Sequence, residues 1–255
     1  MSRRALAICA CLWLAGAAGA TDGAAPPPND DPWEGYNRTM FKFNMAVDHA
    51  VFRPVARGYK AVVPSPVRTG VSNFFSNLMG PLHMVNDLLQ GKPGRAASDL
   101  GRFLVNTTVG IGGLFDPASK LDLKQSDEDF GQTLGKWGVG SGPYLVLPFL
   151  PPTTLRDAFG QVPDYHLDPV NHLERDESRY ELKLVELVDA RARVLDLDEA
   201  IDTAYDPYAF VRDAWLQRRE YKVKDGMVPA SDEDYYDDPA EDPAPAPTPA
   251  IPPAW

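Results

Sequence analysis

The chain has 255 residues, of which 44% are hydrophobic and 10% aromatic, enough for one globular domain with a sizeable core. Its 25 basic residues are outnumbered by 36 acidic ones, for a formal net charge of −11. Non-specific binding of nucleic acid needs basic surface, so this balance excludes it, and it argues equally against electrostatic docking on anionic lipid. Contact with a membrane would have to be apolar or mediated by another protein.

Residues 1–20 have the pattern of a cleaved secretory signal peptide. Two arginines precede a short apolar stretch, and a small-residue cleavage site ends at Ala20. Both cysteines, Cys9 and Cys11, lie inside this segment, so the exported chain would carry no disulfide although its compartment permits one. The proline-rich residues 21–30 are interpreted as a flexible linker.

The first helix is predicted from about Pro32 to His49. Asp31 can cap it, Pro32 suits its first position, and Glu34 completes a capping box. The residue before Pro54 avoids helical angles, so we expect a break there. One face of the helix is aromatic and apolar, and its spacing favours ordinary core. That face consists of Trp33, Tyr36, Met40, Phe43 and Val47.

Apolar residues at helical spacing predict further amphipathic helices. Their expected ranges are 67–78, 81–90, 95–108, 179–204 and 207–221, and the first two of these are expected to form a hairpin. Thr154 and Asp157 form another capping box. No apolar run after the signal approaches the roughly 20 residues of a membrane-spanning helix. The sequence therefore predicts a mainly α protein.

Two segments combine glycine with large apolar residues, at 109–115 and 131–147. Glycine allows backbone angles that other residues avoid and allows close approach of chains. Two interpretations stand side by side. The segments could be tightly packed turns, or irregular apolar backbone that contacts lipid or lines a lipid path.

Residues 225–255 are rich in proline and acid and contain no lysine or arginine. Such a composition cannot bury enough apolar surface to offset the entropy of ordering. We therefore expect a disordered acidic tail after a helical domain at 31–224.

No enzymatic motif is recognisable. Ser141 lacks the spacing of a nucleophile elbow, and the glycines near 110 do not form a dinucleotide-binding loop. The best metal candidate contains Asp164, His166, Asp168 and His172, but prolines interrupt it and no closed ligand set can be named. We predict no catalytic site, no metal and no cofactor.

The segment from Asp31 to Asn44 resembles the opening motif of the MlaA (VacJ) family of Gram-negative outer-membrane proteins. The residues that carry this resemblance are Asp31, Pro32, Glu34, Tyr36, Asn37, Arg38, Phe41, Phe43 and Asn44. Further blocks match at Pro64 to Leu78, Pro81 to Gly91, Arg102 to Asp116, Asp129 to Pro148 and Asp206 to Gln217. The resemblance covers about 31–221.

This resemblance implies a ring-like helical domain with glycine-rich connections, within the inner leaflet of the outer membrane. It implies a central amphipathic channel that removes mislocalised outer-leaflet phospholipids and passes them to a periplasmic carrier of the MlaC type. It also implies association with a trimeric porin. Family members normally have a lipidated cysteine after the signal. Here the apolar stretch before Cys11 is short, so we expect export to the periplasmic face of the outer membrane without lipidation.

Ten residues are candidates for lipid contact, and each could equally serve helix packing. They are Asn73, Phe74, Phe75, Asn77, Gly110, Gly112, Gly113, Trp137, Gly138 and Tyr144. Two other functions remain open: a periplasmic scaffolding protein without lipid transport, and an envelope hydrolase with an unrecognised site. Apolar glycine-aromatic segments favour the lipid-transport hypothesis, because a scaffold has little reason to expose them.

Overall fold

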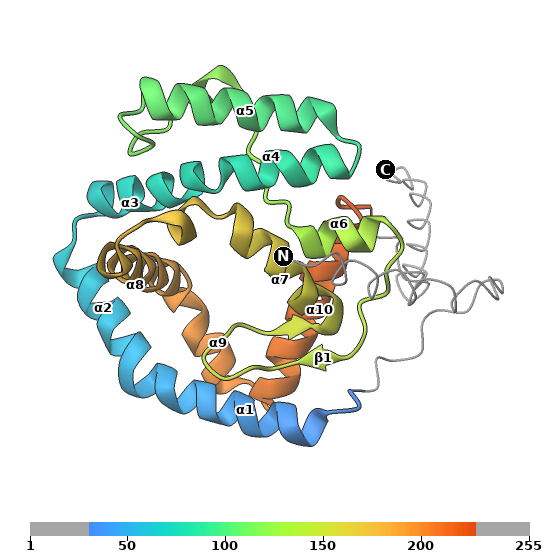
Figure 1. Cartoon of the computed structure of the whole chain (residues 1–255). Coiled ribbons are helices and arrows are strands. Elements are labelled where there is room, and N and C mark those ends of the chain that lie inside the picture. The colour runs from blue at the N-terminus through green and yellow to red at the C-terminus, as the bar shows by residue number, and fades with distance from the viewer. Residues whose placement is uncertain (1–30, 228–255) are drawn as a thin grey trace, which may run out of the picture.

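The computed structural model describes residues 31–227. The predicted signal peptide, the linker and all but the start of the predicted tail lie outside this range. Within it the chain is mainly α, as the sequence predicts, and its helices follow one another around a ring (Figure 1). None of the helices in 31–227 combines the length and apolar character needed to cross a bilayer.

One side of the ring is a nearly continuous helical path. Helix α1 (Glu34–Val47) runs into a π-helical turn, η1 (Asp48–Phe52), and then into α2 (Arg53–Val62). The break predicted before Pro54 is therefore wrong. Proline lacks an N–H and crowds the carbonyl four residues earlier, but the π turn changes the hydrogen-bond register just before it, so the path continues.

The predicted capping box at the start of α1 is also wrong. The carboxylate of Asp31 accepts bonds from the backbone N–H of Trp33 (3.2 Å) and from the amide of Asn37 (2.9 Å). Glu34 does not reach back toward Asp31; it pairs with Arg38 one turn later (2.6 Å). Asp31 thus ties α1 to its surroundings through the side chain of Asn37, which is fully buried.

The top of the ring in Figure 1 contains α3 (Ser65–Leu78), α4 (Gly80–Leu89) and α5 (Pro93–Thr108). The predicted hairpin of the first two is wrong: α3 and α4 lie almost in line, and α4 pairs with α5. Met79 keeps helical angles (φ −78°, ψ −9°), so the chain does not reverse there. The reversal comes at Gly91, whose φ of 75° suits glycine.

Short elements complete this part of the chain. They are the 3₁₀ turn η2 (Ala118–Leu121), α6 (Phe130–Lys136), the strands β1 (Tyr144–Leu145) and β2 (Thr153–Thr154), α7 (Leu155–Leu167) and the 3₁₀ turn η3 (Pro169–His172). The strands are antiparallel, with Tyr144 opposite Thr154. The cap predicted at Thr154 is confirmed, since its hydroxyl accepts the N–H of Asp157 (3.3 Å). Gly160 packs so close to Gly131 that a Cβ would meet backbone at 2.6 Å, which lets α6 and α7 touch.

The predicted helix 179–204 is divided into three elements. These are α8 (Asp176–Arg193), the 3₁₀ turn η4 (Leu195–Leu197) and α9 (Asp198–Thr203). Val194 leaves helical angles (φ −104°, ψ 6°), and the turn brings Asp198 back to Arg191 at 2.7 Å. Helix α10 (Pro207–Val223) follows, with Asp206 capping the N–H groups of Tyr208 and Ala209.

Asp225, the first residue of the predicted tail, contacts the helical domain. Asp225 has only 11% of its side chain exposed, and its carboxylate pairs with Arg95 (2.8 Å), Lys136 (2.8 Å) and Lys92. An acid was assigned to the tail by composition, but three cations from α5, α6 and the α4–α5 turn hold it on the body.

Burial follows an unusual pattern. The aromatic face of α1, predicted as core, is largely exposed: Trp33 is 41% exposed and Tyr36 45%. Helix α5 buries Asp99, Arg102 and Asn106 while its leucines face outward. A conventional apolar cluster forms around Tyr144, Val146 and Tyr208, with Met40, Phe41, Trp215 and Leu216 packed against it.

Candidate functional site

An apolar cavity of about 460 Å³ lies inside the ring. It is formed where α1, η1, α8, α9 and α10 face one another and where the loop between the two strands crosses (Figure 1). Its apolar lining includes Phe41, Met45, Phe52, Val146, Phe149, Leu150, Leu187, Val194, Ile201 and Val211. This volume falls within the usual range for small-molecule sites, and apolar walls with few polar groups are typical of such sites.

The loop over the cavity is held by Asn44 of α1. Its Nδ2 donates to the carbonyl of Leu147 (2.8 Å), and its Oδ1 accepts the backbone N–H of Phe149 (2.9 Å). Phe43, the residue before Asn44, packs edge-to-face on Phe149, with ring centroids 5.2 Å apart. The side chain of Asn44 thus bonds backbone groups of the loop that are not paired in a sheet, and it holds this wall of the cavity in place.

A network of ion pairs closes the opposite wall. Arg191 of α8 bonds Asp48 through Nε (2.7 Å) and Nη2 (2.8 Å), and Nη2 also bonds Asp198 (2.7 Å). Arg53 adds contacts to Asp202 (2.6 Å) and Asp198 (3.1 Å). The network joins η1 and α2 to α8 and α9.

Burial by itself would raise the pKa of Asp48, but the bonds from Arg191 and the charges of Arg53 and His49 lower it below its usual value. The carboxylate is therefore ionised at neutral pH. Asp48 and Arg191 are the only charged residues of the described chain that line the cavity, and they neutralise each other there. An otherwise apolar occupant meets no uncompensated charge.

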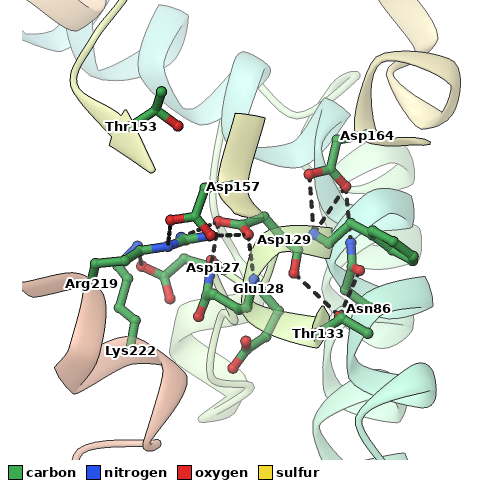
Figure 2. Close-up of polar contacts among 12 residues, drawn as sticks. Asn86, Asp127, Glu128, Asp129, Thr133, Thr153, Asp157, Asp164, Arg219 and Lys222 are labelled. Carbon is green, nitrogen blue, oxygen red and sulfur yellow. Dashed lines mark hydrogen bonds and ion pairs between the residues drawn. The ribbon is translucent and has the colours of Figure 1, made fainter. Parts of the chain in front are cut away.

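A second ionic network fastens α10 to α6 and α7. Figure 2 shows Arg219 between two carboxylates: it bonds Asp129 through Nη2 (2.6 Å) and Nη1, and Asp157 through Nε (2.9 Å). Burial by itself would raise the pKa of Asp129, and Arg219 lowers it. On the other side of α6, Asp164 accepts the N–H of Phe130 (3.1 Å) and the amide of Asn86 (3.3 Å). These contacts close the ring.

The outer side of the molecule carries a second apolar region, the 109–115 loop after α5. Val109 is 70% exposed, Ile111 65% and Phe115 62%. The loop is held from within, because Asp116 accepts bonds from Arg102 (2.8 Å) and Asn106 (3.0 Å). Exposed apolar side chains on a polar-anchored loop are a feature of surfaces that meet apolar partners or lipid.

The ten predicted contact residues fall in four places. Asn73, Asn77 and the glycines at 110, 112 and 113 come together: Asn73 donates to the carbonyl of Leu114 (3.3 Å) and Asn77 to the hydroxyl of Thr107 (2.9 Å). Gly113 has a φ of 89°, and a Cβ there would lie 2.7 Å from Asn77, so this position requires glycine. The 109–115 segment is therefore a tightly packed turn, which is one of the two interpretations that the sequence offered.

The other candidates are separated from that group. Phe74 and Phe75 pack edge-to-face on α3, and Phe75 is buried. Trp137 is 53% exposed and donates its indole N–H to the carbonyl of Leu89 (3.0 Å), with the exposed Gly138 beside it. Tyr144 is 1% exposed and lies in the apolar cluster, away from the other candidates.

None of the ten lines the apolar cavity. Sequence reasoning missed its walls because α1 and η1 are separated in the chain from α8, α9 and α10 by more than a hundred residues. A signal was present at Asn44, the last residue of the opening motif, whose side chain organises the loop over the cavity. The apolar repeat of α8 and α9 predicted a helix but not the cavity that this face lines.

The metal candidate is not assembled. Asp168 pairs with Lys183, His166 faces the carbonyl of Val162 (2.8 Å), and His172 faces the carbonyl of Asp168 (3.1 Å). Across residues 31–227 there is no group of three or more His, Cys, Asp or Glu side chains that could hold a metal ion.

Residues 29–222 match the family model described as MlaA lipoprotein. The chain belongs to the MlaA family. It is 39% identical over 213 residues to the intermembrane phospholipid transport system lipoprotein MlaA of Escherichia coli, covering 82% of this chain and 84% of that protein. The Haemophilus influenzae protein of the same name is 36% identical over 236 residues, covering 91% and 94%.

The fold is also that of a solved MlaA-related structure, described as the structural basis for maintenance of bacterial outer membrane lipid asymmetry. That chain is 41% identical in sequence, with a TM-score of 0.69, and the match covers 76% of this chain and 98% of that one. The similarity therefore includes nearly the whole of the solved MlaA-related chain.

Proposed function

We propose that this protein is the outer-membrane component of a phospholipid transport system that maintains the lipid asymmetry of the outer membrane. Relatives in the MlaA family are named for intermembrane phospholipid transport. The observation that carries the proposal to this chain is the apolar cavity inside the ring, which is bordered by one neutralised ion pair.

In this proposal the cavity receives the acyl chains of a phospholipid, and the polar headgroup stays near its mouth. The transfer is retrograde: a phospholipid from the outer leaflet passes through the ring to a periplasmic lipid-binding carrier of the MlaC type. No covalent bond changes, because the protein selects and conducts lipid. The apolar lining keeps the acyl chains out of water during transfer, which avoids a cost of roughly 25 cal/mol per Å² of exposed acyl surface.

Attachment to the membrane is proposed to be apolar. The 109–115 loop, the outward leucines of α5 and Trp137 present large side chains that would be favourable in the acyl region of an inner leaflet. Of the ten candidates, we retain Asn73, Asn77, the three loop glycines, Phe74, Trp137 and Gly138 as residues near lipid. A trimeric porin is proposed as the protein partner.

The test fills the cavity. Ala190 lines it, whereas Ala200 is exposed on α9. In a strain that lacks this gene and any second homologue, outer-leaflet phospholipid is measured by labelling intact cells. The wild type and Ala200→Trp should restore the low level, and Ala190→Trp should not, although it should reach the outer membrane in equal amount.

Two outcomes would contradict the proposal at different points. If Ala190→Trp fully restored the low level of outer-leaflet phospholipid, the cavity would not be the lipid path. An unchanged lipid distribution in the deletion strain would favour the second hypothesis, a periplasmic scaffolding protein without lipid transport.

A further inference from the structure

Two buried carboxyls face each other inside the α4–α5 hairpin. Asp87 of α4 is 0% exposed and Asp99 of α5 is 2% exposed. Neither oxygen of Asp87 has a hydrogen-bond partner of normal geometry among the described residues, and one oxygen of Asp99 is likewise unpartnered. The other oxygen of Asp99 accepts the backbone N–H of Ser126 (3.1 Å).

The two carboxyls lie within hydrogen-bonding reach of each other, and the side chain of Ser126 is near Asp87. Two ionised carboxylates at this separation would repel, and each would be a buried charge. A single proton removes both problems, since it satisfies an oxygen on each side and leaves one charge.

The surrounding ionic groups are committed elsewhere. Glu128, in the loop before α6, accepts from Lys92 (2.9 Å) and Arg95 (3.2 Å). Arg102 of α5 donates to Asp116, and His83 of α4 contacts the carbonyl of Glu128 through Nδ1 (2.8 Å).

On α7, Asp164 reaches α4 through Asn86. Asp164 is half-buried, and burial raises its pKa as well. The cations named at this face, Lys92, Arg95 and Arg102, are thus each bonded to a carboxylate other than Asp87 and Asp99.

We propose that the α4–α5 hairpin is a proton-dependent latch, closed while Asp87 and Asp99 share a proton and loosened when both carboxyls ionise. The hairpin leads directly into the 109–115 loop, whose inner anchors Arg102 and Asn106 are on α5. Loosening therefore weakens the support of the outer apolar surface. This last consequence rests on the proposed function, and the latch itself does not.

The direction of the pH effect follows from the proton balance. Burial, then the bond with Asp99, raises the pKa of Asp87 from 3.8 to about 7. An opened hairpin releases this proton, so opening becomes more favourable as pH rises between those two values and levels off above about 7. One proton released per opening corresponds to an opening constant that rises about tenfold per pH unit in that window.

The experiment is hydrogen–deuterium exchange of the purified chain between pH 5 and 8, with each rate divided by its intrinsic exchange rate. Amides of α4 and α5 should open about tenfold more per pH unit up to about pH 7, while amides of α8 should not. Asp87→Asn keeps the shape and removes the proton equilibrium, so its α4–α5 profile should be flat. The matched control Asp164→Asn should keep the wild-type slope.

A second measurement tests the latch even if the Asp87→Asn variant does not fold. Carboxyl ¹³C NMR of the wild type should show one buried aspartate that titrates near neutral pH. Flat α4–α5 exchange in the wild type, an unchanged slope in Asp87→Asn, or titration of every aspartate in the acid range would each overturn the latch. These outcomes leave the outer-leaflet phospholipid assay unaffected, so the two proposals fail separately.

Discussion

The α4–α5 hairpin and the wall of the cavity bury opposite kinds of side chain. Helix α5 turns Asp99, Arg102 and Asn106 inward and exposes Leu100 and Leu104. Around the cavity, apolar side chains face inward and the charges lie at the edge as neutralised pairs. In the first region hydrogen bonds and ion pairs hold the elements together. In the second, apolar packing forms the wall, and a space remains within it.

The difference shows why amphipathicity alone did not locate the core. The apolar face of a helix can pack against the protein interior or against another apolar phase. The spacing of apolar residues in the sequence is the same in both cases. Helix α5 is the clear case, because its buried face is the polar one. An arrangement with polar anchors inside and leucines outside is what an apolar environment would favour.

The largest effect is expected from removing an inward charge of α5. Arg102→Met removes the charged donor of the Asp116 carboxylate, which keeps only its bonds from Asn106 and Ser119. The carbonyl of Leu123 also loses its bond from Arg102. Breaking a buried pair from one side should lower the free energy of unfolding by about 3 kcal/mol. Urea denaturation measures this. The exposed Arg57→Met should change stability by less than about 0.5 kcal/mol, and equal losses would contradict the polar-core interpretation.

A matched valine pair sharpens the comparison. Val146 is 1% exposed in the apolar cluster and Val109 is 70% exposed in the outer loop. Val146→Ala should destabilise by about 2 kcal/mol through lost burial and a small cavity, whereas Val109→Ala should stay within about 0.5 kcal/mol. Thermal unfolding of the two variants against the wild type is sufficient. A reversed order would mean that the outer loop is covered in the isolated protein.

Acid titration separates the anchored Asp225 from exposed acids. Burial would raise its pKa, but Lys136 and Lys92 lower it to about 2, against 3.8 for the free side chain. The folded state thus binds its proton later than the unfolded state, so this stabilisation is complete above about pH 4 and is lost as pH falls toward 2. Asp225→Asn should remove about 1–2 kcal/mol at neutral pH and flatten the acid limb.

The control for that titration is Asp213→Asn, whose carboxylate is 53% exposed beside Arg212. It should follow the wild-type curve. If Asp225→Asn followed it too, the domain would end before residue 225 in solution, as the composition suggested.

Replacing exposed leucines of α5 should have the smallest effect on stability but a clear effect on binding to lipid. Changing both Leu100 and Leu104 to serine removes side chains that are 45% and 53% exposed, so unfolding should shift by less than about 0.5 kcal/mol per site. Binding to vesicles of phosphatidylethanolamine and phosphatidylglycerol should fall severalfold in a flotation assay. The exposed Lys120→Ser serves as control, and unchanged flotation of the leucine variant would place the membrane contact elsewhere.

The sequence by itself determined the fold class, the family and most helix positions, because these depend on local periodicity, capping and the spacing of motif residues. Ranges such as 81–90 and 207–221 agree closely with α4 and α10. It did not determine how far a helical path continues past Pro54, or that Val194 would interrupt a strong apolar repeat. A π turn and the ion pair between Arg191 and Asp198 decided those points.

Only the tertiary structure decided which face of each helix is inside. Periodicity gives a face but not its partner, so the aromatic side of α1 was assigned to the core although Trp33 and Tyr36 are exposed. Tyr144, a candidate for lipid contact, lies buried in the apolar cluster. The cavity is assembled by α1 and η1 together with α8, α9 and α10, which follow more than a hundred residues later in the chain. The Asp87–Asp99 pair is formed by two helices that a glycine turn folds together. Such sites depend on long-range contacts, which carry no signal in local sequence.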